Sequence, residues 1–81
     1  MGDITDSGTQ YIVIKPTTLI DEVSLTEYYI GVSNNGNNPN SNIWQIKKIK
    51  KTGNVWNITL YPNGSQEFKF IWNNRTEYIY K

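Results

Sequence analysis

Carboxylates are the side chains of this sequence that come closest to a catalytic set. Hydrolysis and group transfer need a nucleophile beside a base, a pair of carboxylates, or a bound metal ion. The chain has no His and no Cys, which excludes Ser–His and Cys–His pairs and thiolate metal sites. Of its seven acidic residues only Asp21 and Glu22 are adjacent, and neighbours on a strand point to opposite faces. We therefore predict no enzymatic activity, no cofactor and no metal ion.

A basic cluster is the sequence feature that best matches a nucleic-acid site. Residues 47–51 are Lys-Lys-Ile-Lys-Lys, flanked by Trp44 and Trp56. Lysines neutralise phosphates, and aromatic rings stack on bases. Ile49 interrupts the run, however, and the formal net charge of the chain is only +1. Because lysines on an edge strand also block pairing between sheets, we interpret the cluster as solvated strand residues and predict no nucleic-acid partner.

The aromatic content indicates binding. The chain has three Trp, six Tyr and two Phe in 81 residues, more than a thin domain of this size encloses. Tyr and Trp are enriched at interface hot spots, whereas carbohydrate sites use exposed aromatic rings beside Asn and Gln. Arg75 is expected to stack on Trp72 or to cap the last turn, with a planar guanidinium that Lys does not replace. The predicted contact residues are Tyr29, Trp44, Trp56, Trp72, Arg75, Asn35, Asn37 and Asn38.

The length of the chain sets its domain organisation. We predict a flexible N-terminal arm over residues 1–10 and a single β-rich domain over residues 11–81. Domains this small usually gain stability from disulfides, metals or partners. With no Cys and no His, oligomerisation or docking on another protein is the expected source. No apolar run reaches the length of a membrane span, and the polar N-terminus does not resemble a secretory signal, so no membrane partner and synthesis in the cytoplasm are expected.

Alternating apolar residues and turn signals predict an antiparallel fold. We expect strands over residues 11–15, 24–32, 43–49 and 55–61, and a loop or short strand over 17–23. Trp56, Ile58 and Leu60 are expected to face inward together. Turns are predicted at 52–54 and 62–65, where Gly and Pro occur. The fold class is therefore all-β, mainly antiparallel, as a small β-sandwich or a partly open barrel.

Two segments are harder to assign. Phe68, Phe70 and Trp72 have the spacing of a strand, whereas Phe68, Ile71 and Trp72 also fit a helix. We favour strand, with one short helical turn near residues 67–74 as the alternative. Residues 33–42 contain Gly, Pro and several Asn, which predicts a loop that is mobile alone or fixed by a partner. The abundance of Asn, Ile and Lys also fits AT-rich codon usage.

The second half of the chain carries a pattern that resembles a known group of proteins. Tyr29-Ile30-Gly31 is followed by a polar loop, then by Trp44-x-Ile46-x-x-Ile49 and by Phe68-x-x-Ile71-Trp72-x-x-Arg75. Over residues 28–80 this is similar to short proteins encoded by tailed bacteriophages, often with virion genes. The resemblance implies a virion component for capsid decoration, neck, tail or fibre attachment, made in the host cytoplasm and present in several copies.

Two functions therefore follow from the sequence. The first is a phage virion structural or assembly protein that docks on other virion proteins, with homo-oligomerisation expected. The alternative is a carbohydrate-binding module in which exposed Trp and Tyr act with Asn and Gln on a glycan.

Overall fold

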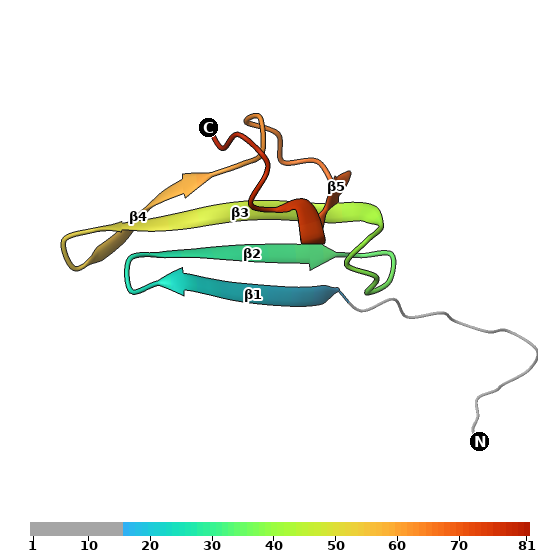
Figure 1. Ribbon diagram of the computed structural model, residues 1–81, viewed down its shortest axis with the longest axis horizontal. Coiled ribbons are helices and arrows are strands. Elements are labelled where there is room, and N and C mark those ends of the chain that lie inside the picture. The colour runs from blue at the N-terminus through green and yellow to red at the C-terminus, as the bar shows by residue number, and fades with distance from the viewer. Residues whose placement is uncertain (1–15) are drawn as a thin grey trace, which may run out of the picture.

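The computed structural model describes residues 16–81 (Figure 1). The predicted arm over residues 1–10 and the predicted strand over 11–15 lie outside this part of the chain. The elements are β1 (Thr17–Ser24), β2 (Glu27–Ser33), β3 (Asn42–Thr52), β4 (Val55–Leu60), β5 (Phe70–Ile71) and the 3-10 turn η1 (Trp72–Asn74). No helix within residues 16–81 has the length and apolar character needed to cross a membrane.

The strands form one five-stranded antiparallel sheet in the order β1-β2-β3-β4, with β5 also paired to β3. β3 is the longest strand, and its second half pairs with β4 while its first half pairs with β5. The predicted all-β, mainly antiparallel fold is confirmed. The strand favoured for Phe68, Phe70 and Trp72 is corrected, because it is limited to Phe70–Ile71 and the chain continues as the helical turn Trp72–Asn74, which is the alternative given for residues 67–74. The sheet is open, because its first strand, β1, does not return to pair with its last.

Local sequence explains the connections. The chain reverses between β3 and β4 at Gly53, which has φ +62°. It reverses again at 62–65, where Asn63 and Gly64 both have positive φ, as the two central residues of a type I′ turn require. The Gly64 N–H donates to the Tyr61 carbonyl at 3.0 Å, and the Ser65 N–H donates to the Pro62 carbonyl at 2.9 Å. The turns predicted at both places are confirmed.

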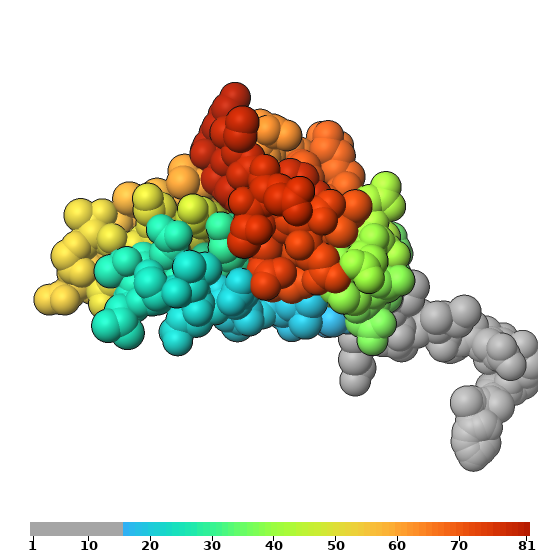
Figure 2. All heavy atoms as spheres, viewed as in Figure 1, coloured from blue at the N-terminus to red at the C-terminus, as the bar shows by residue number. Residues whose placement is uncertain are grey.

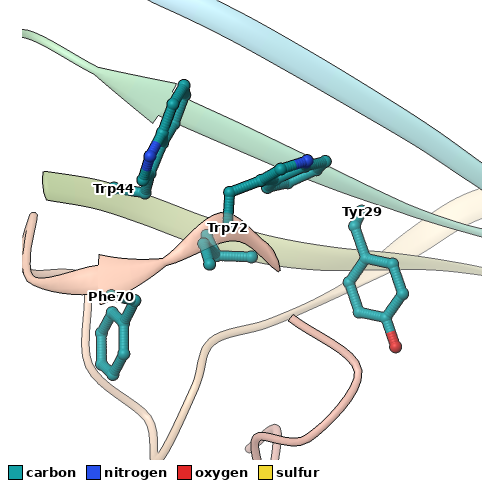
Figure 3. Packing of buried hydrophobic residues seen from close by; sticks show 5 residues of the cluster. Tyr29, Trp44, Phe70 and Trp72 are labelled. Atoms are coloured by element: carbon teal, nitrogen blue, oxygen red, sulfur yellow. The ribbon is translucent and has the colours of Figure 1, made fainter. Parts of the chain in front are cut away.

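The core lies between one face of the sheet and the C-terminal segment, residues 72–81, which consists of η1 and the chain that follows it. The buried hydrophobic residues are Tyr29, Trp44, Ile46, Phe70 and Trp72, and Tyr78 and Tyr80 pack against them. Figure 3 shows Trp72 between Trp44 and Tyr29. Gly31 permits this arrangement, because a Cβ there would lie 2.7 Å from Trp72 Cζ3. Figure 2 shows the C-terminal segment over the middle of the sheet, with the β1–β2 and β3–β4 turns projecting beyond it.

The strand register assigns every sheet residue to one of two faces, since residues directly opposite each other point the same way. Tyr29, Gly31 and Ser33 on β2 oppose Lys48, Ile46 and Trp44 on β3, and together they form the covered face. The intervening residues form the open face, which points away from the C-terminal segment. Its apolar members are Ile20, Tyr28, Ile30, Val32, Ile49 and Trp56, and its polar members include Thr18, Glu22, Gln45, Lys47, Lys51 and Thr59.

Candidate interaction surface

Three of the predicted contact residues belong to the core. Tyr29, Trp44 and Trp72 expose only 6%, 0% and 6% of their surface. Tyr29 packs on Tyr80 with ring centroids 5.4 Å apart, and Trp44 packs on Trp72 at 6.2 Å. Side chains enclosed in this way cannot meet a partner, so the structure corrects the predicted contact surface at these positions. Alternation alone did not reveal which face the C-terminal segment would cover.

Arg75 has the role that its spacing from Trp72 predicts. Its guanidinium carbon lies 4.6 Å from the centre of the Trp72 ring, and its backbone N–H caps η1 by donating to the Trp72 carbonyl. The side chain also donates from Nη1 to that carbonyl at 3.2 Å and from Nε to Asp21 Oδ2 at 2.9 Å. Arg75 therefore joins η1 to β1 and stabilises the covered face.

The Asn-rich loop divides into two halves. In the second half, the Asn38 carbonyl accepts a hydrogen bond from the buried Trp44 Nε1 at 2.9 Å. The Pro39 carbonyl accepts from the Asn73 N–H at 3.0 Å, and Asn40 Oδ1 accepts from Asn73 Nδ2 at 2.6 Å. A buried indole N–H needs an acceptor, and this loop supplies it. The expectation of a loop that is fixed only by a partner is therefore wrong for residues 38–41.

The first half of the loop, residues 34–37, is exposed. Within it, the Asn35 N–H donates to Ser33 Oγ at 3.2 Å. Asn35 and Asn37 remain available for contact, whereas Asn38 acts inside the chain through its backbone carbonyl and through Oδ1, which accepts from the Asn40 N–H.

The basic cluster is split between the two faces by strand alternation. Lys48 points to the covered face, where its Nζ lies 3.4 Å from Glu27 Oε1 and 5.5 and 5.7 Å from the ring centres of Tyr29 and Tyr80. Burial raises the pKa of Tyr80 above its usual range, so its hydroxyl stays protonated and donates to the Arg75 carbonyl at 2.7 Å. Lys47 and Lys51 point to the open face. The lysines therefore form no continuous basic surface.

Trp56 lies on the open face because β4 contains a bulge. Ile58 opposes Lys50, but Trp56 opposes Lys51, so Asn57 is the extra residue and the alternation changes phase. Trp56 is 44% exposed, contacts Tyr28 edge-on at 5.0 Å, and lies beneath the Lys51 ammonium at 5.3 Å. The prediction that Trp56 faces inward with Ile58 is corrected by this bulge, whereas its place among the contact candidates remains open.

The apolar side chains of the open face are contiguous. Ile20 opposes Ile30, which in turn opposes Lys47. The neighbouring row across the strands on this face consists of Glu22, Tyr28 and Ile49. Val32 extends the patch toward the other end of β2. Ile20 is 66% exposed, and the other members are partly exposed. Large contiguous apolar surfaces mark interaction sites more often than isolated exposed residues do, so the open face is the candidate interaction surface.

The same geometry bears on the two other kinds of site considered for this chain. The Tyr28 and Trp56 rings meet at 72°, so this pair gives no coplanar platform on which a sugar ring could stack. Within residues 16–81 there is no group of three or more acidic side chains placed to hold a metal ion. Comparisons of the chain with protein-family models, curated proteins and solved structures give no match.

Proposed function

We propose that this chain is a structural or assembly protein of a bacteriophage virion and that it acts by docking on other protein chains. The observation that carries the docking proposal is the apolar open face. Its centre is β-branched and aromatic, and its margins are polar, which is the composition of a protein contact surface. The virion setting rests on the resemblance of residues 28–80 to short phage proteins.

The thin core supports the same proposal. One sheet and one C-terminal segment bury five large hydrophobic residues in the described chain. Domains of this size bury a smaller share of their surface than large domains do, and they often need a partner for added stability. Burial of a residue such as Ile20 or Ile30 by a partner contributes on the order of 1.5–3 kcal/mol. Docking therefore supplies stability that the isolated domain does not gain from its own packing.

Mass spectrometry of purified phage particles tests the virion setting, and we expect the chain to be present in several copies. Absence of the chain from particles would contradict this setting. Ile30→Glu tests the docking surface, because a carboxylate at the centre of the open face resists burial. We expect this variant to fold and to be lost from particles. Ile79→Glu is the matched control, since Ile79 is 68% exposed in the C-terminal segment, away from the open face.

A further inference from the structure

The two margins of the open face carry opposite charges. Glu22 lies on β1 at one margin, and Lys47 and Lys51 lie on β3 toward the other. On the covered face, Asp21 and Glu27 are paired with Arg75 and Lys48. Among residues 16–81, by contrast, Glu22, Lys47 and Lys51 take part in no ion pair. The open face therefore has an apolar strip between Glu22 on β1 and the two lysines on β3, with Trp56 on β4 beyond Lys51.

Such a pattern is complementary to itself. Consider a two-fold axis parallel to the strands and above β2, which places β2 over the β2 of a second copy and β1 over the second copy's β3. Because the axis runs along the strands, this rotation leaves the position of each residue along the strand direction unchanged. Glu22 is level with Ile49, which lies between Lys47 and Lys51. Each Glu22 then faces the two lysines of the other copy, and Ile30 and Tyr28 meet their own counterparts near the axis.

We propose that the open face binds a second copy of this chain, face to face, about this two-fold axis. Symmetric dimers require a patch that matches itself, and opposite charges at opposite margins satisfy that requirement, whereas a face of uniform charge would repel its copy. Sheets packed face to face lie about 10 Å apart with strands crossing at about 30°, which brings long Glu and Lys side chains within reach. The inference rests on the proposed docking function and names the partner.

Charge reversal gives the most specific test. Glu22→Lys places three lysines on the face, and the double variant Lys47→Glu and Lys51→Glu places three glutamates there. Each variant should repel its own copy and raise the dimer dissociation constant on the order of tenfold or more. Mixed in equal amounts, the two variants should form a heterodimer, because one charge contact is then the same as in wild type and the other has its charges exchanged, so that both are attractive. Sedimentation velocity over a concentration series measures the association of each variant alone and of the mixture.

The controls use the full-length chain. Wild type should sediment with twice the monomer mass of 9.4 kDa. Ile30→Glu should be monomeric and Ile79→Glu dimeric, and near-ultraviolet circular dichroism verifies that each variant is folded. A wild type that is monomeric at every concentration overturns the proposal and leaves the face to another protein or to residues 11–15 of the same chain. Folded charge variants that dimerise alone, or fail to pair when mixed, overturn it as well.

The particle experiment separates this inference from the proposed function. If wild type is monomeric in solution but present in virions, and Ile30→Glu is absent from them, the dimer proposal is rejected and docking on another virion protein is retained. If wild type is a dimer but is absent from virions, the dimer proposal is retained and the proposed role in the virion is rejected.

Discussion

The covered face and the open face of the sheet differ in how their polar and aromatic groups are satisfied. On the covered side, the Trp44 indole, the Tyr80 hydroxyl and the Arg75 guanidinium all have partners within the chain. Within residues 16–81, no buried side-chain nitrogen or oxygen lacks one. On the open side, aliphatic β-branched residues dominate, and Glu22, Lys47 and Lys51 form no ion pair with another residue of 16–81. Most of the large aromatic residues therefore build the core, and Ile and Val form most of the apolar surface.

This division has a physical cause. Few residues are available to fill the space between a single sheet and the short irregular segment that covers it. Aromatic side chains suit this position because each one buries a large area. Their polar atoms then need partners, which the loop and the C-terminal segment provide. Exposed Ile and Val are favourable strand formers and need no hydrogen bonds when a partner later covers them.

The largest expected difference between the faces comes from one substitution made on both. Trp72→Ala should lower the free energy of unfolding by about 3–5 kcal/mol, because it leaves a cavity against Trp44 and Gly31. Trp56→Ala on the open face should cost less than about 1 kcal/mol in the monomer. Urea denaturation of both variants, at protein concentrations too low for association, measures the contrast. Equal losses would mean that the faces are not packed differently.

Gly31→Ala should produce the next largest effect. The added methyl group would be forced into the Trp72 ring, and overpacking of this kind costs about 1–3 kcal/mol. The neighbouring change Val32→Ala, on the open face, is the matched control and should cost less. Thermal melts followed by circular dichroism compare the two. A melting temperature unaffected by Gly31→Ala would show that Trp72 has room to move.

The two halves of the Asn-rich loop should respond differently to the same replacement. Changing residues 38–41 to a Gly-Ser sequence of equal length should cost on the order of 1–2 kcal/mol, because the acceptor for Trp44 Nε1 is no longer held in place. The same change at residues 34–37 should stay within about 0.5 kcal/mol. Urea denaturation with Trp fluorescence reports both. Two neutral replacements would show that the loop is not needed to satisfy Trp44.

Among the changes on the covered face, Arg75→Lys should have the smallest effect, about 1 kcal/mol, because an ammonium stacks less well on Trp72 and does not reproduce the bonds to Asp21 and to the Trp72 carbonyl. The change keeps the charge, so any loss reports on the planar group. A melting curve identical to that of wild type would place the stabilisation in the charge alone.

Much of the fold was predictable because it is encoded locally. Alternation identified β2, β3 and β4, and the Gly and Pro signals identified the turns at 52–54 and 62–65. The stacking of Arg75 on Trp72 also follows from residues three positions apart. β1 was ambiguous, because Asp21 interrupts its inward face. Its ion-pair partner, Arg75, is 54 residues away in the sequence, so no local sequence pattern predicts the pair.

The candidate surface was less predictable for the same reason. β2 has apolar residues on both faces, so its sequence does not show which face becomes the core. That choice depends on Trp72 fitting over Gly31, a contact between distant segments. The bulge at Asn57 leaves no clear signal either, and it moves Trp56 from one face to the other. The burial of Tyr29, Trp44 and Trp72 therefore required the tertiary structure.

The hydrogen bond from the Gly64 N–H to the Tyr61 carbonyl affects the rate at which the protein deamidates. An Asn–Gly pair deamidates when the glycine nitrogen attacks the asparagine side-chain carbonyl, closes a five-membered imide and releases ammonia. At Asn63 that nitrogen is held by the Tyr61 carbonyl at 3.0 Å. At Asn35 the Gly36 nitrogen has no acceptor among residues 16–81, and the space around Gly36 is open.

Asn35 should therefore deamidate first when the protein is stored at mildly alkaline pH, with Asn63 following only on unfolding. Peptide mapping by mass spectrometry distinguishes the two sites. Faster loss at Asn63 in the folded protein would show that the turn opens more readily than its hydrogen bonds suggest. Ageing would otherwise convert the exposed half of the loop from neutral to anionic and bring the formal net charge of the chain from +1 to zero.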